Sequence, residues 1–172
     1  MSRFVSEPLG KHDRSTFASG NARIDTYFKQ TVSQDVKRNY AVCYVLVERE
    51  SARLAGFYTL SSHGIALSDL ATEWAKKLPR YPSVPAALIG WLGRDLSFRG
   101  QSVGSMLIYD AIARLAASPA GVHAVCADAI DADAAAFYKA HQFEAFLSRP
   151  QRFYLPMKTA LALVNEPANG CA

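Results

Sequence analysis

One stretch near the middle of the chain constrains the fold more than any other. The run AALIGWLGRDL (86–96) is almost continuously apolar, which is typical of a strand that is buried on both faces. It is followed by RGQSVGS (99–105), by the amphipathic stretch MLIYDAIARLAA (106–117) and by a second apolar run, VHAVCADA (122–129). A strand, a helix and a strand in this order predict a right-handed crossover between two parallel strands.

The flanking segments add further strands and helices. Apolar residues recur at helical spacing over 22–38, and the runs AVCYVLV (41–47) and RLAGFYTLSS (53–62) predict an antiparallel hairpin. We also predict a helix over 68–77 with Ser68 as N-cap, an extended loop over 78–85, a helix over 131–141, and short strands over 143–148 and 152–157. Together these elements predict an α/β fold with a mixed central β-sheet and helices on both faces.

Length and composition indicate one globular domain. The chain has 172 residues, of which 50% are hydrophobic and 20% charged, so we expect a single domain over 1–172 with a short flexible C-terminal tail from about 165. No apolar stretch approaches the ~20 residues that a membrane-spanning helix needs. The start, MSRFVSEPLGKHDR, has no apolar core of a secretory signal. We therefore expect a cytoplasmic protein with no membrane contact.

Cysteine and histidine residues give no sign of a metal site. Cys43, Cys126 and Cys171 are far apart and form neither a disulfide framework nor a paired metal motif. Cys43 and Cys126 lie in apolar runs, which predicts that they are small core residues. The four histidines are equally scattered. We expect no metal.

The segment RGQSVGS has two possible interpretations. Between a buried strand and a helix, such a loop points several backbone N–H groups in one direction, the helix macrodipole adds positive potential, and Arg99 adds a full charge. These features suit a pyrophosphate. The segment lacks the Gly-Lys-Ser/Thr ending of a P-loop and the three spaced glycines of a dinucleotide fingerprint. An ordinary strand-to-helix turn explains it equally well.

Positive charge is concentrated just before this loop. The whole chain carries a net charge of +4, and the residues from Lys76 to Arg99 alone give five basic side chains against Asp95, which is also +4. Such a concentration indicates a polyanionic ligand, with a solvated basic face as the alternative.

The loop and the next helix together resemble the GNAT superfamily of acetyl-CoA-dependent N-acetyltransferases. The phosphate loop of that family has the form Q/R-x-x-G-x-G/A, which Arg99 and Gly104 match, with Ser102 at the middle glycine. The later family pattern, N-x-x-A-x-x-x-Y-x-x-x-G-F, is similar to residues 131–143. Asp131 stands at its asparagine position, and the further matches are Ala134, Tyr138 and Phe143, whereas Gln142 replaces the glycine.

A narrower resemblance covers roughly residues 5–160. The segments FASGNARIDTYF, QDVKRNYAVCYVLV, GFYTLSS, KKLPRYPSVPAALIGWLGRD and RFYLPMKTAL are similar to those of GNAT toxins of bacterial toxin–antitoxin pairs. This resemblance implies acetylation of the α-amine of an aminoacyl-tRNA, which stops translation. It also implies a ribbon–helix–helix antitoxin as partner and is compatible with a homodimer.

The resemblance assigns roles to individual residues. Tyr138 is the expected general acid that protonates the departing CoA thiolate; packing at the end of a helix is the alternative. The residues expected to bind acetyl-CoA are Arg94, Leu96, Arg99, Gly100, Gln101, Ser102, Val103, Gly104, Ser105 and Asp131. The residues expected to contact tRNA phosphates are Lys76, Lys77 and Arg80, which otherwise form a solvated surface.

The strand before the loop offers no glutamate as a general base, only Asp95 at its end. A lysine amine with a pKa near ~10.4 needs such a base, whereas an α-amine titrates near ~7.7–8.0 and needs little help. The absence therefore favours an aminoacyl ester as acceptor. Two alternatives stay open: an acetyltransferase of a small amine or a protein N-terminus, and a non-catalytic regulator that binds acyl-CoA.

Overall fold

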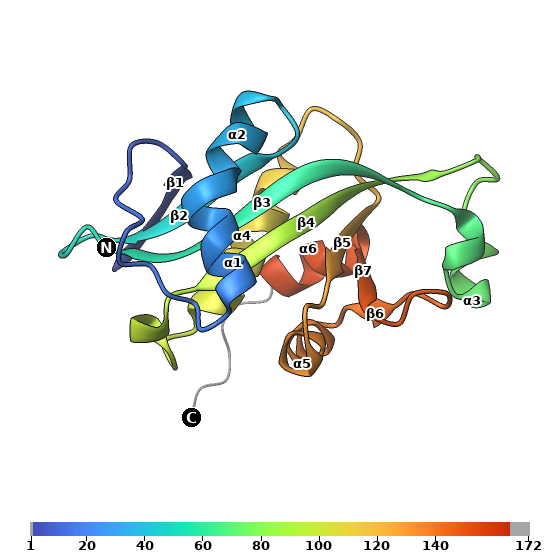
Figure 1. Cartoon of the computed structure of the whole chain (residues 1–172). Coiled ribbons are helices and arrows are strands. Elements are labelled where there is room, and N and C mark those ends of the chain that lie inside the picture. Colours follow the sequence, from blue (N-terminus) through green and yellow to red (C-terminus); the bar gives the residue numbers. More distant parts are fainter. Residues whose placement is uncertain (1, 166–172) are drawn as a thin grey trace. The chain divides into compact units, whose positions relative to one another are not determined.

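The strands form one sheet, which carries the candidate site. The computed structural model describes residues 2–165, so Cys171 and the tail expected after about 165 lie outside the described residues. Over that range the sheet has the strand order β1-β2-β3-β4-β5-β7-β6. The strands are β1 (Phe4–Pro8), β2 (Val42–Glu48), β3 (Leu54–Ile65), β4 (Val84–Arg94), β5 (Ala124–Asp128), β6 (Glu144–Ala145) and β7 (Arg152–Pro156). The α-helices are α1 (Ala22–Thr26), α2 (Val32–Lys37), α3 (Thr72–Ala75), α4 (Val103–Ala116), α5 (Ala132–Ala140) and α6 (Met157–Asn165) (Figure 1).

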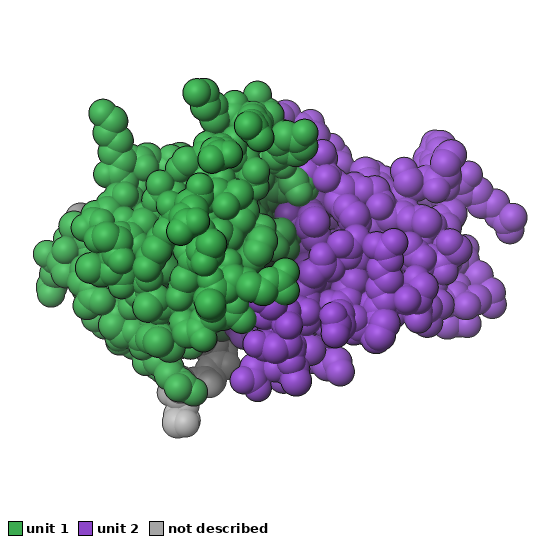
Figure 2. Space-filling view, in the orientation of Figure 1, with its two compact units in different colours: residues 1–61, 89–111 green, residues 62–88, 112–172 purple. Residues whose placement is uncertain are grey.

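The chain divides into two compact units. Unit 1 comprises residues 1–61 and 89–111, and unit 2 comprises residues 62–88 and 112–172 (Figure 2). Strands β3 and β4 and helix α4 contribute residues to both units. The α/β class and the mixed sheet expected from the sequence are confirmed.

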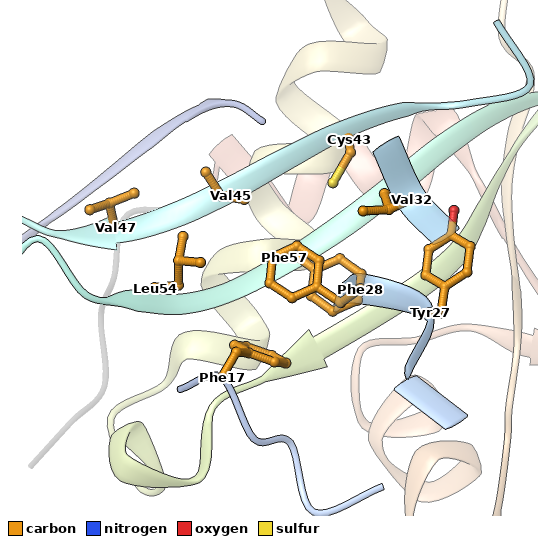
Figure 3. Packing of buried hydrophobic residues seen from close by; sticks show 9 residues of the cluster. All are labelled: Phe17, Tyr27, Phe28, Val32, Cys43, Val45, Val47, Leu54 and Phe57. Atoms are coloured by element: carbon orange, nitrogen blue, oxygen red, sulfur yellow. The ribbon is translucent and has the colours of Figure 1, made fainter. Parts of the chain in front are cut away.

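Unit 1 has an aromatic core between a helical segment and a hairpin. The hairpin β2–β3 is antiparallel as predicted, with Val45 opposite Phe57. Helices α1 and α2 are joined by a π-helical turn over Tyr27–Thr31, and this segment packs on one face of the hairpin (Figure 3). At the centre, the rings of Phe28 and Phe57 stack with centroids 3.9 Å apart. The helical periodicity over 22–38 is thereby confirmed.

Helix α4 lies against the other face of β3 within unit 1. A β-carbon added to Gly56 would lie 2.8 Å from Leu107 Cδ1, so the glycine permits this close approach. The helix begins at Val103, three residues before the predicted start, because the Val103 side chain is fully buried. The last three residues of the RGQSVGS segment are therefore the first turn of the helix.

Unit 2 is built on the antiparallel pair β5–β7, in which Ala124 pairs with Pro156 and Asp128 with Arg152. Its core contains Cys126 and Tyr154, and the edge of Trp74 packs on the Tyr154 ring at 6.1 Å. Both described cysteines, Cys43 in unit 1 and Cys126 in unit 2, are buried as predicted.

Several predictions of local structure were wrong. The helix predicted over 68–77 is a 3-10 turn, Leu67–Asp69, followed by the short α3, whose N-cap is Ala71 and not Ser68. Buried Leu70 lies between the two in extended backbone, which interrupts the helix. Of the strand predicted over 143–148, only Glu144–Ala145 (β6) forms a strand. The predicted loop ends earlier, since β4 begins at Val84. Strand β1 and helix α6 were not anticipated.

Candidate functional site

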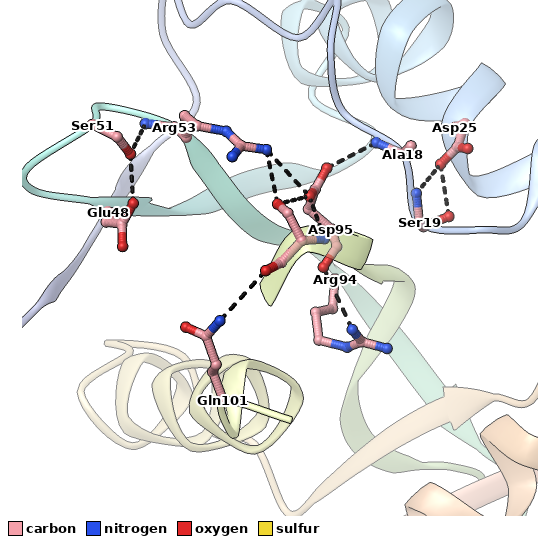
Figure 4. Close-up of polar contacts among 10 residues, drawn as sticks. Ala18, Ser19, Asp25, Glu48, Ser51, Arg53, Arg94, Asp95 and Gln101 are labelled. Atoms are coloured by element: carbon pink, nitrogen blue, oxygen red, sulfur yellow. Dashed lines mark hydrogen bonds and ion pairs between the residues drawn. The ribbon is translucent and has the colours of Figure 1, made fainter. Parts of the chain in front are cut away.

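Asp95 anchors the turn that leads from β4 into the candidate phosphate loop. Asp95 is 4% exposed, and its carboxylate accepts hydrogen bonds from the Ala18 amide (2.9 Å), from the Ser97 amide (2.9 Å) and from the Ser97 hydroxyl. The Arg53 guanidinium lies 3.7 Å away (Figure 4). Burial opposes the charged carboxylate, but these hydrogen bonds and Arg53 outweigh it and lower the pKa of Asp95. A fixed, ionised Asp95 thus holds the start of the loop.

The loop itself contains two residues in the left-handed region. Gly100 has φ +74° and Ser102 has φ +58°. Glycine adopts a positive φ without steric cost, so the left-handed backbone of Ser102 explains why the GNAT pattern favours glycine at this position. A β-carbon on Gly100 would meet nothing within 4 Å, so this side of the loop is open to a ligand.

Helix α4 begins directly after this loop. The amide of Met106 donates to the Ser102 carbonyl (3.0 Å), which starts the ordinary helical pattern. The first N–H groups of a helix have no carbonyl partner within it, and they favour an anion. Arg99, Gly100 and Ser102 are exposed and Gly104 is half-buried, whereas the Val103 side chain belongs to the core.

Arg94, Leu96 and Gln101 lie around the base of the same loop. The Leu96 amide donates to the Ala18 carbonyl (2.8 Å) and its carbonyl accepts from the Arg99 amide (3.1 Å), so its backbone groups are occupied and its side chain is 47% exposed. Arg94 is half-buried, with Nη1 3.4 Å from the Asp95 carbonyl oxygen. Gln101 donates to the Ser97 carbonyl (3.4 Å). Leu96 therefore has both backbone groups engaged in local hydrogen bonds and an exposed side chain beside the loop.

In unit 2, Tyr138 lies on α5 with its ring almost fully buried at 5% exposure. The ring contacts Phe143 at 5.3 Å and Phe153 at 6.0 Å between centroids. Burial, and the negative charge of Asp128, raise the pKa of the Tyr138 hydroxyl well above its ordinary value. The hydroxyl is therefore protonated throughout the physiological range, as a general acid must be before it acts.

The end of α5 is held by backbone hydrogen bonds around Gln142. The Gln142 amide donates to the Lys139 carbonyl (3.0 Å) and the Phe143 amide to the Tyr138 carbonyl (3.1 Å), which together form a Schellman motif. Gln142 has φ +65°, and this is again the position where the GNAT pattern has glycine. Both departures from the family pattern thus fall on left-handed backbone.

The other predicted site residues of unit 2 have simpler surroundings. Asp131 is the N-cap of α5, and its Oδ1 accepts from the Ala134 amide at 2.8 Å. Lys76, Lys77 and Arg80 are exposed in the turn and loop that follow α3, with Lys76 Nζ 3.8 Å from Glu73 Oε1. Sequence reasoning missed the anchoring role of Asp95, although the spacing of Asp95 and Ser97 is typical of a side-chain-stabilised turn.

The described residues were compared with the side-chain grouping of a metal site and the helix length of a membrane span. Within residues 2–165, no group of three His, Cys, Asp or Glu side chains is arranged to hold a metal ion. No helix in that range combines the length and apolar character needed to cross a membrane.

Sequence comparison identifies relatives over nearly the whole chain. The chain is 32% identical over 171 residues to a probable toxin TacT of Sinorhizobium fredii, covering 93% of this chain and 94% of the relative. The chain belongs to the family of GNAT-type acetyltransferase toxins of toxin–antitoxin systems. A second family member, a tRNA-acetylating toxin of Mycobacterium tuberculosis, is 31% identical over 156 residues, covering 90% and 92% of the two chains. No family model matches the chain.

Solved structures of GNAT toxins have the same fold. A tyrosine-to-phenylalanine variant of KacT superposes with a TM-score of 0.86 at 24% identity, covering 94% of this chain and 99% of KacT. AtaT complexed with acetyl-methionyl-tRNAfMet gives 0.83 at 23% identity, covering 93% and 98%. A variant of AtaT bound to acetyl-CoA and the C-terminus of its antitoxin AtaR gives 0.80 at 20% identity, covering 96% and 100%.

Proposed function

We propose that this toxin transfers the acetyl group of acetyl-CoA to the α-amine of an aminoacyl-tRNA, which blocks translation, and that an antitoxin neutralises it. The observation that carries the proposal is the likeness, along 90% of the chain, to a tRNA-acetylating toxin. A ribbon–helix–helix protein is the proposed antitoxin and a homodimer the proposed assembly. One domain over residues 1–172 would act in the cytoplasm, where its substrate is found.

The loop at the start of α4 is the proposed site for the CoA pyrophosphate. Its open side at Gly100, its exposed Arg99 and the positive end of α4 fit an anion of that size. Ser102 and Ser105 would add hydroxyl donors, and Gln101 and the backbone of Val103 and Gly104 would complete the cradle. Arg94 and the exposed side chain of Leu96 would lie toward the pantetheine arm. Asp131, at the start of α5, is proposed to bind acetyl-CoA as well.

Tyr138 is the proposed general acid of the reaction. The amine nitrogen forms a bond to the thioester carbonyl carbon, the carbon–sulfur bond breaks, and the Tyr138 proton goes to the sulfur. The nitrogen loses one proton, and Tyr138 regains a proton from solvent. The raised pKa of Tyr138 keeps that proton available until the thiolate leaves. Lys76, Lys77 and Arg80 would hold the acceptor through its phosphates, since contacts to phosphate need charge more than exact geometry.

Replacement of the Tyr138 hydroxyl tests this function. Tyr138→Phe keeps the ring and its contacts with Phe143 and Phe153, so the protein should fold and bind acetyl-CoA as before. Turnover should fall by about 10²–10⁴-fold, the usual contribution of a general acid. Expression of the parent should arrest growth and leave acetylated aminoacyl-tRNA, detected by mass spectrometry. Arrest without acetylated tRNA would exclude the substrate, and arrest by the Phe variant at equal expression would exclude Tyr138.

A further inference from the structure

In unit 2, the end of β5 carries a carboxylate whose orientation is fixed by its neighbours. Asp128 is the last residue of β5 and pairs in register with Arg152, the first residue of β7. Arg152 donates from Nε to Asp128 Oδ1 at 2.6 Å and from Nη2 to Oδ2 at 2.7 Å. This is a bidentate pair, which holds the carboxylate plane in one direction.

Arg152 is itself held from a second side. Its Nη1 lies 3.3 Å from Nε2 of His63 on β3. Because arginine has no acceptor, Nε2 must be the accepting nitrogen, so His63 is neutral here and carries its proton on Nδ1. Burial, followed by the charge of Arg152, lowers the pKa of His63, in agreement with a neutral ring. Three of the five guanidinium donors are thus engaged in fixing the position of Arg152.

The two partners of the ion pair differ in how far their side chains are exposed to solvent. The Arg152 side chain is 19% exposed, whereas the Asp128 side chain is 46% exposed. Each carboxylate oxygen can accept more than the single hydrogen bond that it receives from Arg152. Asp128 is therefore the member of the pair that can accept a hydrogen bond from a ligand, and Arg152 is the member that orients it.

Asp128 and Tyr138 flank the same end of the sheet. The Tyr138 ring packs on Phe153, which pairs with Ala127, the residue before Asp128. Side chains alternate along a strand, so Arg152 and Asp128 lie on the face opposite to Phe153. One face at the end of β5 thus carries a proton donor and the other a fixed carboxylate.

We propose that Asp128 accepts a hydrogen bond from the acceptor amine and takes the proton that this nitrogen loses, while Arg152 positions the carboxylate. This inference rests on the proposed function. When the nitrogen attacks the thioester carbon it becomes positively charged, and one of its protons passes to Asp128 and then to water. The carbon–sulfur electron pair leaves with sulfur, which takes the Tyr138 proton. The products are the amide and CoA thiol, and the two side chains regain their starting states through solvent.

Chemical rescue of a truncated variant tests this role. Asp128→Ala should fold and bind acetyl-CoA with the parent affinity, because Asp128 is not among the residues proposed to bind acetyl-CoA. Its turnover on aminoacyl-tRNA should fall by about 10²-fold, the lower end for a general base, since an α-amine needs limited assistance. Added formate should restore part of this turnover, because Arg152 can hold it where the carboxylate was. The double variant Asp128→Ala with Arg152→Gln should show no rescue.

Two further variants keep the test decisive. Asp128→Asn preserves the side-chain shape and should lose turnover to the same extent, which covers the case in which the alanine variant does not fold. Glu144→Gln is the matched control, since it removes a carboxylate that accepts from Tyr154 (3.0 Å) on the neighbouring strand and should turn over like the parent. Turnover of Asp128→Asn within about threefold of the parent would overturn the proposal, as would a folded Asp128→Ala that formate does not rescue. If the parent itself leaves aminoacyl-tRNA unmodified, the proposed function fails instead.

Discussion

The end of α5 carries a glutamine where the backbone favours glycine, and its replacement should stabilise the protein. Gln142 occupies the C′ position of the Schellman motif with φ +65°. Its side chain is exposed, so Gln142→Gly removes no packing. The two hydrogen bonds of the motif involve only backbone atoms, and the contact between Phe143 and Tyr138 at 5.3 Å is unaffected.

The expected gain in the free energy of unfolding is the difference between a relieved backbone strain and an added loss of conformational entropy. A non-glycine residue in the left-handed region costs about 1–2 kcal/mol. Glycine loses more conformational freedom on folding, which offsets about 0.5–1 kcal/mol of that gain. The free energy of unfolding should therefore rise by about 0.5–1 kcal/mol. For a chain of this length, such a change corresponds to an increase in Tm of about 1–4 °C.

Urea denaturation of the parent and two control variants measures this gain. Gln142→Ala keeps the β-carbon in the left-handed region and should not gain stability. Ala136→Gly places glycine on the exposed side of α5 and should lose about 1 kcal/mol. Turnover of Gln142→Gly should equal that of the parent. A free energy of unfolding for Gln142→Gly at or below the parent value would refute the argument from backbone strain.

Three further outcomes are expected. Gly104→Glu places bulk and negative charge in the first turn of α4, so acetyl-CoA affinity by calorimetry should be lost, and an unchanged Kd would remove this loop from the site. Neutralising Lys76, Lys77 and Arg80 together should weaken tRNA binding and flatten its dependence on salt, with acetyl-CoA binding unchanged; equal salt slopes would show a merely solvated surface. The lowered pKa of Asp95 means that its contribution to stability is present above the ordinary carboxyl pKa, near ~3.9, and is lost as pH falls through the lowered value. Asp95→Asn should therefore be less stable at pH 7 and show a smaller loss on acidification, and parallel pH curves from urea denaturation would contradict this.

The sequence by itself predicted the elements whose signals are local and repeated. Apolar spacing over 22–38, alternation in the β2–β3 hairpin and the apolar stripe of α4 each depend on side-chain type at fixed intervals, and burial follows from them. The candidate phosphate loop and Tyr138 were proposed from a family resemblance, whose motif residues are close together in the chain. Ser102 and Gln142, which stand where the family pattern has glycine, have left-handed backbone in the structure, although the sequence analysis did not predict this.

Tertiary packing decided the remaining features, because they depend on partners that are distant in sequence. Buried Leu70 interrupts the helix predicted over 68–77, and buried Val103 moves the start of α4 into the loop. Asp95 holds the loop to a distant segment through the Ala18 amide, which is 77 residues away in the chain. Asp128 and Arg152 are 24 residues apart, and only the register of β5 with β7 brings a carboxylate and a guanidinium into a bidentate pair. Local pattern determines where an element forms, whereas the long-range register of strands determines which charges meet.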